Sequence, residues 1–216
     1  MLSEDYILRM IGQATAVLLK IIGFKKNGDL PEAQQAVDQA LETLVGLKAD
    51  LIKQLDDESL FTTLTRDGNL DFARLALVAD LFKEDGDIAA VQGRMSESRE
   101  SYLRSLIYHL ETGFDESIPP DDELTAKIKS LVQILGLQTL PDETLWTLFC
   151  YYELAGNFPE ADDAIVNLAE RPNSKADIQP ELVAFYERLL QKPDAELAAS
   201  GMEREALKNK LKEAKK

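Results

Sequence analysis

Three short segments of this chain are near copies of one another and read as turns between helices. They span residues 28–33, 93–98 and 156–161, and each has Gly, a polar residue, an apolar residue, one variable position, Glu and a small residue. Apolar residues recur at three- and four-residue steps on both sides, which is typical of amphipathic helices. Glycine readily adopts the left-handed conformation that ends many helices. The chain is therefore expected to fold as a series of antiparallel helical hairpins.

The rest of the pattern predicts an all-α protein of about nine to eleven helices with no sheet, because no long segment alternates apolar and polar residues between turns. Hairpins are expected over residues 1–113 and again over 121–216, the latter ending in a terminal cap. Residues 114–120 contain Pro119 and Pro120, which cannot continue a helix, and form the expected link. Both parts are predicted to belong to one continuous solenoid.

One glycine lies inside a predicted helix rather than at its end. Gly86 falls within the long apolar pattern of residues 70–92. A glycine in a helix interior costs about 1 kcal/mol relative to alanine. This position therefore predicts close packing against a neighbouring helix.

The chain is acidic, with a formal net charge of −15. Residues 27–202 hold about −20, because the first 26 residues carry +2 and residues 203–216 carry +3. Nucleic acids and anionic membrane surfaces bind through Lys and Arg, so neither is an expected partner. A basic protein or peptide would be attracted.

The sequence predicts neither a secreted nor a membrane protein. Its longest apolar stretch, residues 14–24, is interrupted by Thr15, Lys20 and Gly23, and a membrane span needs about 20 apolar residues. The single cysteine, Cys150, excludes an intrachain disulfide. We expect a soluble protein of the cytoplasm.

Signals for chemistry are few. His109 is the only histidine, and Cys150 lies between Phe149 and Tyr151 on an aromatic helix, so both are expected to be packing residues. The sequence has no phosphate-binding glycine loop and no metal-binding spacing. It predicts no catalytic residues, no metal and no cofactor.

The turns and their flanking helices resemble the tetratricopeptide repeat, a helix-turn-helix unit of 34 residues. In the third unit the matching positions are Leu145, Leu148, Tyr152, Gly156, Asn157, Phe158, Ala161 and Ile165. The small residues Ala33, Ser98 and Ala161 are 65 and 63 residues apart, close to two repeat lengths. The layout, with Asp-Tyr-Ile-Leu at 5–8 and Ala-Val-Gln-Gly at 90–93, also resembles an uncharacterised bacterial family known only as a domain of unknown function.

The first helix of each unit lines the concave binding face in tetratricopeptide proteins. When the positions of this face are carried over to the present sequence, the resemblance implies a binding face that contains Lys83, Asp87, Glu143, Trp146 and Glu153. Large aromatic side chains dominate interface energetics, so Trp146 is the expected anchor. Relatives that clamp the terminal carboxylate of a peptide use Lys, Asn and Arg on this face. Lys83 stands nearly alone here, so that mode is not expected.

Three functions remain open on this basis. The first is a non-catalytic scaffold that binds a protein or peptide. The second is a self-associating structural protein that uses its N-terminal helix, with Ile11, Leu18 and Ile22, as a homodimer seam. The third is a small-ligand sensor or an enzyme with a pocket between helices.

Overall fold

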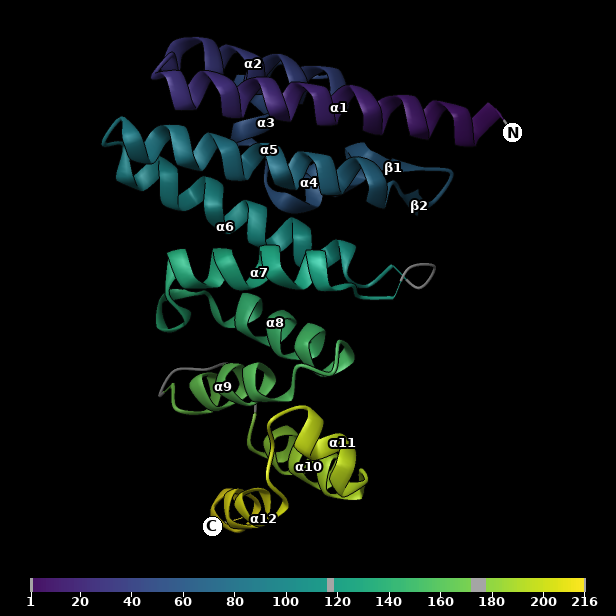
Figure 1. Cartoon of the computed structure of the whole chain (residues 1–216), viewed down its shortest axis with the longest axis vertical. Coiled ribbons are helices and arrows are strands. Elements are labelled where there is room, and N and C mark those ends of the chain that lie inside the picture. The colour runs from purple at the N-terminus through teal and green to yellow at the C-terminus, as the bar shows by residue number, and fades with distance from the viewer. Residues whose placement is uncertain (1, 116–118, 172–177, 216) are drawn as a thin grey trace. The chain divides into compact units, whose positions relative to one another are not determined.

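The computed structural model describes residues 2–115, 119–171 and 178–215, and in them the chain is all-α (Figure 1). The first half of the chain contains α1 (Leu2–Asn27), α2 (Leu30–Val45), α3 (Ala49–Gln54), α4 (Asp57–Leu64), β1 (Thr65–Arg66), β2 (Asn69–Leu70), α5 (Phe72–Val91) and α6 (Met95–Thr112). The second half contains α7 (Asp122–Leu135), the short 3-10 helix η1 (Leu137–Thr139), α8 (Asp142–Leu154), α9 (Phe158–Ala169), α10 (Gln179–Gln191), α11 (Asp194–Ala199) and α12 (Arg204–Ala214).

Two details of the predicted fold were wrong. The described residues form twelve α-helices rather than nine to eleven, and Gly201 at φ 81° separates the short α11 from α12. They also form a small sheet, in which β1 and β2 pair antiparallel with Thr65 opposite Leu70. Asp67 and Gly68 between the strands both have positive φ, the conformation of a two-residue hairpin turn. Strands of two residues are too short to show an alternating pattern.

The three copied turns have one backbone conformation. Their glycines are left-handed, at φ 82°, 77° and 73° for Gly28, Gly93 and Gly156. The next residue in each turn has φ between −80° and −85° and ψ between 62° and 66°. Its N–H donates to the carbonyl five residues earlier, over 2.9 Å in the first two turns and 2.8 Å in the third. This hydrogen bond satisfies a carbonyl at the end of the preceding helix, as in a Schellman motif. The predicted helix reversals are confirmed.

The chain divides into two compact units. Unit 1 comprises Met1–Ser117 with Lys127–Leu131, and unit 2 comprises Ile118–Ala126 with Val132–Lys216. In unit 1, α1 packs on α2, α2 packs on α5, and α5 packs on α6; in unit 2, α8 packs on α9 and α10 on α12 (Figure 1). The predicted division at 114–120 and the continuous solenoid stay predictions. Residues 116–118 of that link lie outside the described residues.

The core of unit 1 is built from the inward faces of its helices. Fully buried side chains include Ile21, Val37, Leu41, Leu60, Leu75, Val78 and Tyr108. Gly86 lies at the contact between α5 and α6, because a Cβ added there would come within 2.7 Å of the Tyr102 ring. The predicted close packing at Gly86 is confirmed. Among the described helices, none is both long and apolar enough to cross a membrane.

Candidate binding site

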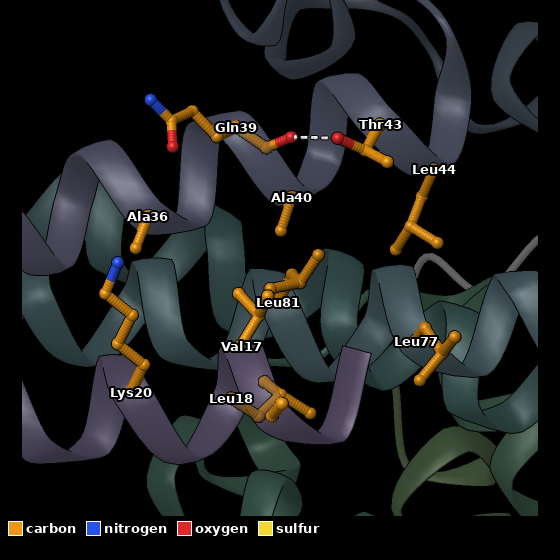
Figure 2. Close-up of a pocket in the computed structure, with 11 residues that line it drawn as sticks. Val17, Leu18, Lys20, Ala36, Gln39, Ala40, Thr43, Leu44, Leu77 and Leu81 are labelled. Atoms are coloured by element: carbon orange, nitrogen blue, oxygen red, sulfur yellow. Dashed lines mark hydrogen bonds between the residues drawn. The ribbon is translucent and has the colours of Figure 1, made fainter. Parts of the chain in front are cut away.

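An open apolar groove lies between α1, α2 and α5 in unit 1 (Figure 2). Its volume is about 430 Å³, within the range of ligand-binding clefts. The lining is contributed by Ala16, Val17, Leu18 and Lys20 of α1, by Ala36, Gln39, Ala40, Thr43 and Leu44 of α2, and by Leu77 and Leu81 of α5. The groove therefore exposes an apolar interior to solvent.

Small side chains leave this space between two antiparallel helices. Figure 2 shows Ala40 opposite Val17 and Ala36 opposite Lys20 across it. Leu81, which is only 2% exposed, lies beneath them on α5. Alanine is too short to close the distance between the helices, so the groove stays open above a packed floor.

Few polar groups face the groove. The Thr43 hydroxyl donates to the backbone carbonyl of Gln39 over 2.7 Å, and the Gln39 amide points away from the groove in Figure 2. Lys20 is exposed at the rim, and its ammonium lies 5.4 Å from the centre of the Phe24 ring. No described carboxylate pairs with Lys20. The rim thus offers one cation, and the interior offers apolar contact.

Lys83 and Asp87, two of the residues predicted to bind a ligand, instead pair with each other. The Lys83 ammonium lies 2.8 Å from the Asp87 carboxylate on α5. Lys25 of α1 also pairs with Asp87, and it donates to Glu84 over 2.6 Å. The Tyr102 hydroxyl of α6 donates to Asp87 over 2.8 Å. These contacts tie α1 and α6 to α5, so a ligand would have to compete with them.

The pKa of Asp87 reflects these partners. Burial alone raises it, but hydrogen bonds from Lys25 and Lys83 outweigh burial and lower the pKa below its ordinary value. The carboxylate is therefore charged at neutral pH and already neutralised by its neighbours.

Asp85 forms a second polar cluster that the sequence analysis missed. This carboxylate is 7% exposed and accepts from Lys53 over 2.7 Å, from Gln34 over 2.8 Å and from Ser101 over 2.7 Å. Burial raises its pKa, but Lys53 and the two neutral donors lower it further than burial raises it. The acidic residues within 84–87 indicated a polar cluster in the sequence. The partners of Asp85, however, come from α2, α3 and α6, which are distant in the sequence, so the sequence near Asp85 does not reveal them.

The other predicted binding residues lie on α8 in unit 2. Trp146 is 39% exposed and packs against Phe149 with ring centres 5.6 Å apart. Glu153 accepts two hydrogen bonds from the guanidinium of Arg188, each 2.8 Å long, and Arg188 also binds Glu181. The Glu143 side chain is exposed. Trp146 is therefore half open to solvent, while Glu153 is held within the unit.

The two chemically reactive side chains, Cys150 and His109, lie in different units. Burial, together with the nearby Glu153 and Glu181, raises the pKa of the Cys150 thiol to about 11, so the thiol is protonated at neutral pH. His109 is 2% exposed, and its Nε2 lies 3.3 Å from Asp80, which also binds Lys127 at 3.0 Å. The part of the chain that the structure describes holds no group of three or more His, Cys, Asp or Glu that could bind a metal.

Comparison with known proteins agrees with the expectation of an uncharacterised family. A family model described as "Family of unknown function (DUF6483)" matches residues 1–216. No curated protein and no solved structure matches the chain. Since the family model covers the whole sequence, the chain belongs to the DUF6483 family of unknown function.

Proposed function

We propose that this protein is a non-catalytic, tetratricopeptide-like scaffold that binds an apolar protein segment in the groove between α1, α2 and α5. The observation that carries the proposal is the open apolar groove of about 430 Å³. Soluble proteins rarely leave such surface exposed without a use, and grooves between helices accept the apolar face of another helix. A single cysteine suits a reducing, cytoplasmic location.

The tetratricopeptide-like part of the proposal rests on how helices pair within each unit. Lys25 of α1 pairs with Glu84 of α5, and the earlier residue Val17 lines the groove together with Leu77 and Leu81, which precede Glu84, so α1 and α5 run parallel. In unit 2, Phe149 lies 5.3 Å from Phe185 between ring centres, so α8 lies beside α10. First helices lying side by side, with the same turn after α1, α5 and α8, support a tetratricopeptide-like stack of repeats, which is right-handed in that family.

A protein segment fits the groove better than a small polar ligand. Small-molecule sites combine an apolar pocket with several polar groups that converge on the ligand. Here the Thr43 hydroxyl is already used on the backbone, and Lys20 alone offers charge at the rim. Apolar side chains at helical spacing need no such polar groups. The groove is thus proposed as the binding face in place of Lys83 and Asp87, which are paired internally.

Site-specific photo-crosslinking tests this proposal. A photo-reactive residue placed at Thr43, which lines the groove and is exposed, is expected to give a discrete adduct in extract of cells that produce the protein. The same residue at Gln35 is the matched control, because Gln35 is also exposed on α2 but does not line the groove. Equal amounts of adduct from both positions, or no adduct from Thr43, would rule out docking in the groove.

A further inference from the structure

The last helix of unit 2 is basic, whereas the helices beside it are acidic. Residues 203–216, which contain α12, carry six basic and three acidic residues. By contrast, α9 carries Glu160, Asp162 and Asp163 and no basic residue. α12 packs on α10, and α10 also packs on α9. The chain thus holds a basic segment of its own against an acidic surface.

One lysine connects α12 to a buried carboxylate of α9. Asp162 is only 5% exposed, and it accepts hydrogen bonds from the Lys210 ammonium and, over 2.7 Å, from the Tyr186 hydroxyl of α10. A buried carboxylate is costly unless a cation pairs with it, and Tyr186 is a neutral donor. Asp162 therefore forms a specific site for a positively charged side chain.

The other contacts between α12 and α10 are few. The fully buried side chains of α12 are Leu207 and Ala214, which lie seven residues apart on the same helix face. The Gln179 amide donates to the Ala214 carbonyl, and the Lys215 ammonium lies 2.7 Å from the exposed Glu187. A helix of 11 residues is marginal by itself, so α12 depends on these contacts for its helical structure.

A separate set of contacts holds the first turn of α12. The Arg204 guanidinium pairs with Asp194 of α11 and donates to the carbonyls of Lys192 and, over 2.6 Å, Leu190 at the end of α10. Release of the later turns of α12 leaves these contacts in place. A displaced α12 thus stays tethered beside the surface that it covered.

From this arrangement we propose that α9 and α10 form a second binding surface, whose ligand is a basic amphipathic helix of a partner protein, and that α12 is its internal occupant. The ligand places a Lys or Arg against Asp162, with apolar side chains three residues before and four residues after it, as Leu207, Lys210 and Ala214 do in α12. Because α12 is tethered at a high local concentration, it excludes weaker ligands. This surface belongs to unit 2 and the apolar groove to unit 1, so neither proposal depends on the other.

Binding of a labelled peptide of residues 205–216 to the full chain tests the surface. Fluorescence anisotropy should show weak binding to the wild-type chain, because α12 occupies the site. Lys210→Asp in the chain brings two carboxylates together and releases α12, so this variant should bind the wild-type peptide about tenfold more tightly. Adding Asp162→Asn to that variant should remove the gain.

Lys212→Asp is the matched control. It makes the same change of charge on α12, but Lys212 is exposed and has no partner among the described residues. This variant should bind the peptide no more tightly than the wild-type chain does. An equal gain from Lys212→Asp, or no gain from Lys210→Asp, overturns the proposal.

Amide hydrogen exchange tests displacement without a substitution in the chain. Millimolar unlabelled peptide should speed exchange in α12 of the isotopically labelled wild-type chain, measured by NMR, and should leave exchange in α2 of unit 1 unchanged. The same peptide with Lys210→Asp should have no effect. If the wild-type peptide leaves exchange in α12 unchanged, α12 is a fixed part of the fold and the proposal is wrong.

Discussion

Gly86 shows how one residue sets the distance between two helices. A methyl group there would lie 2.7 Å from the Tyr102 ring and 3.2 Å from the Ser98 carbonyl, closer than van der Waals contact. Gly86→Ala is therefore expected to lower the free energy of unfolding by about 1–3 kcal/mol, although alanine favours helix. Urea unfolding measures the change. In the Tyr102→Ala background the contact with the ring is gone and only the Ser98 carbonyl contact remains, so the loss should be smaller. An equally large loss there would contradict the steric explanation.

Arg104 holds a short helix in place from the inside of unit 1. Its guanidinium is buried and donates to the backbone carbonyls of Lys53 over 2.9 Å and Leu55 over 2.8 Å, at the end of α3. It also lies 4.6 Å from the centre of the Phe82 ring. Such carbonyls have no partner within their own helix, so the arginine replaces the missing hydrogen bonds.

Replacing this side chain tests that role. Arg104→Met is expected to cost roughly 3 kcal/mol of unfolding free energy, because it leaves buried carbonyls unpaired. Arg104→Lys keeps the charge but not the planar fork, so it should recover only part of the loss. Chemical denaturation measures both variants. Full recovery by lysine would show that charge alone, and not the fork of donors, stabilises α3.

At the scale of elements, the C-terminal end of α1 is fixed to α5. Lys25 pairs there with Glu84 and Asp87, and Glu84 is only 6% exposed. Lys25→Met should lower the free energy of unfolding by about 1–3 kcal/mol, because the buried Glu84 then keeps only Lys83, whose ammonium lies 3.4 Å away. It should also speed hydrogen exchange in α1. Lys26→Met is the matched control, since the neighbouring Lys26 is exposed. Equal effects of the two variants would contradict a specific anchor.

Elements differed in how far the sequence could predict them. The turns were predictable because a left-handed glycine and its neighbours determine a helix reversal locally, as at Gly28 and Gly156. The contact at Gly86 was predictable for a different reason, because a glycine costs stability inside a helix and suggests that a neighbouring helix packs closely there. The Lys83–Asp87 pair has the i,i+4 spacing of a local ion pair, but the sequence could not show that Lys25, 62 residues from Asp87, completes the cluster. The groove could not be predicted either, since it is the space that small side chains on separate helices fail to fill.

At the scale of the whole molecule, the charged groups with altered pKa are distributed unevenly. Asp80, Asp85 and Asp87 all belong to unit 1, and although burial raises the pKa of each, their cationic partners lower it below the ordinary value. In unit 2, burial and the neighbouring Asp162 raise the pKa of Asp163 instead. A carboxyl group with a lowered pKa stabilises the fold above its unfolded-state pKa of about 4, and this contribution is lost as the pH falls through the folded pKa. A raised pKa has the opposite effect.

Acid should therefore destabilise unit 1 more than unit 2. Trp146, the only tryptophan, lies in unit 2 and reports on its unfolding, whereas far-ultraviolet circular dichroism reports on the helices of both units. When the pH is lowered from about 7 to about 3, the midpoint temperature of thermal unfolding measured by circular dichroism is expected to fall by more degrees than the midpoint measured by tryptophan fluorescence. Replacing Asp85 and Asp87 with Asn should reduce that difference, because the groups that take up protons are then gone. Equal decreases of the two midpoint temperatures in the wild-type chain would show that the pH dependence of stability does not come mainly from the ion pairs of α5.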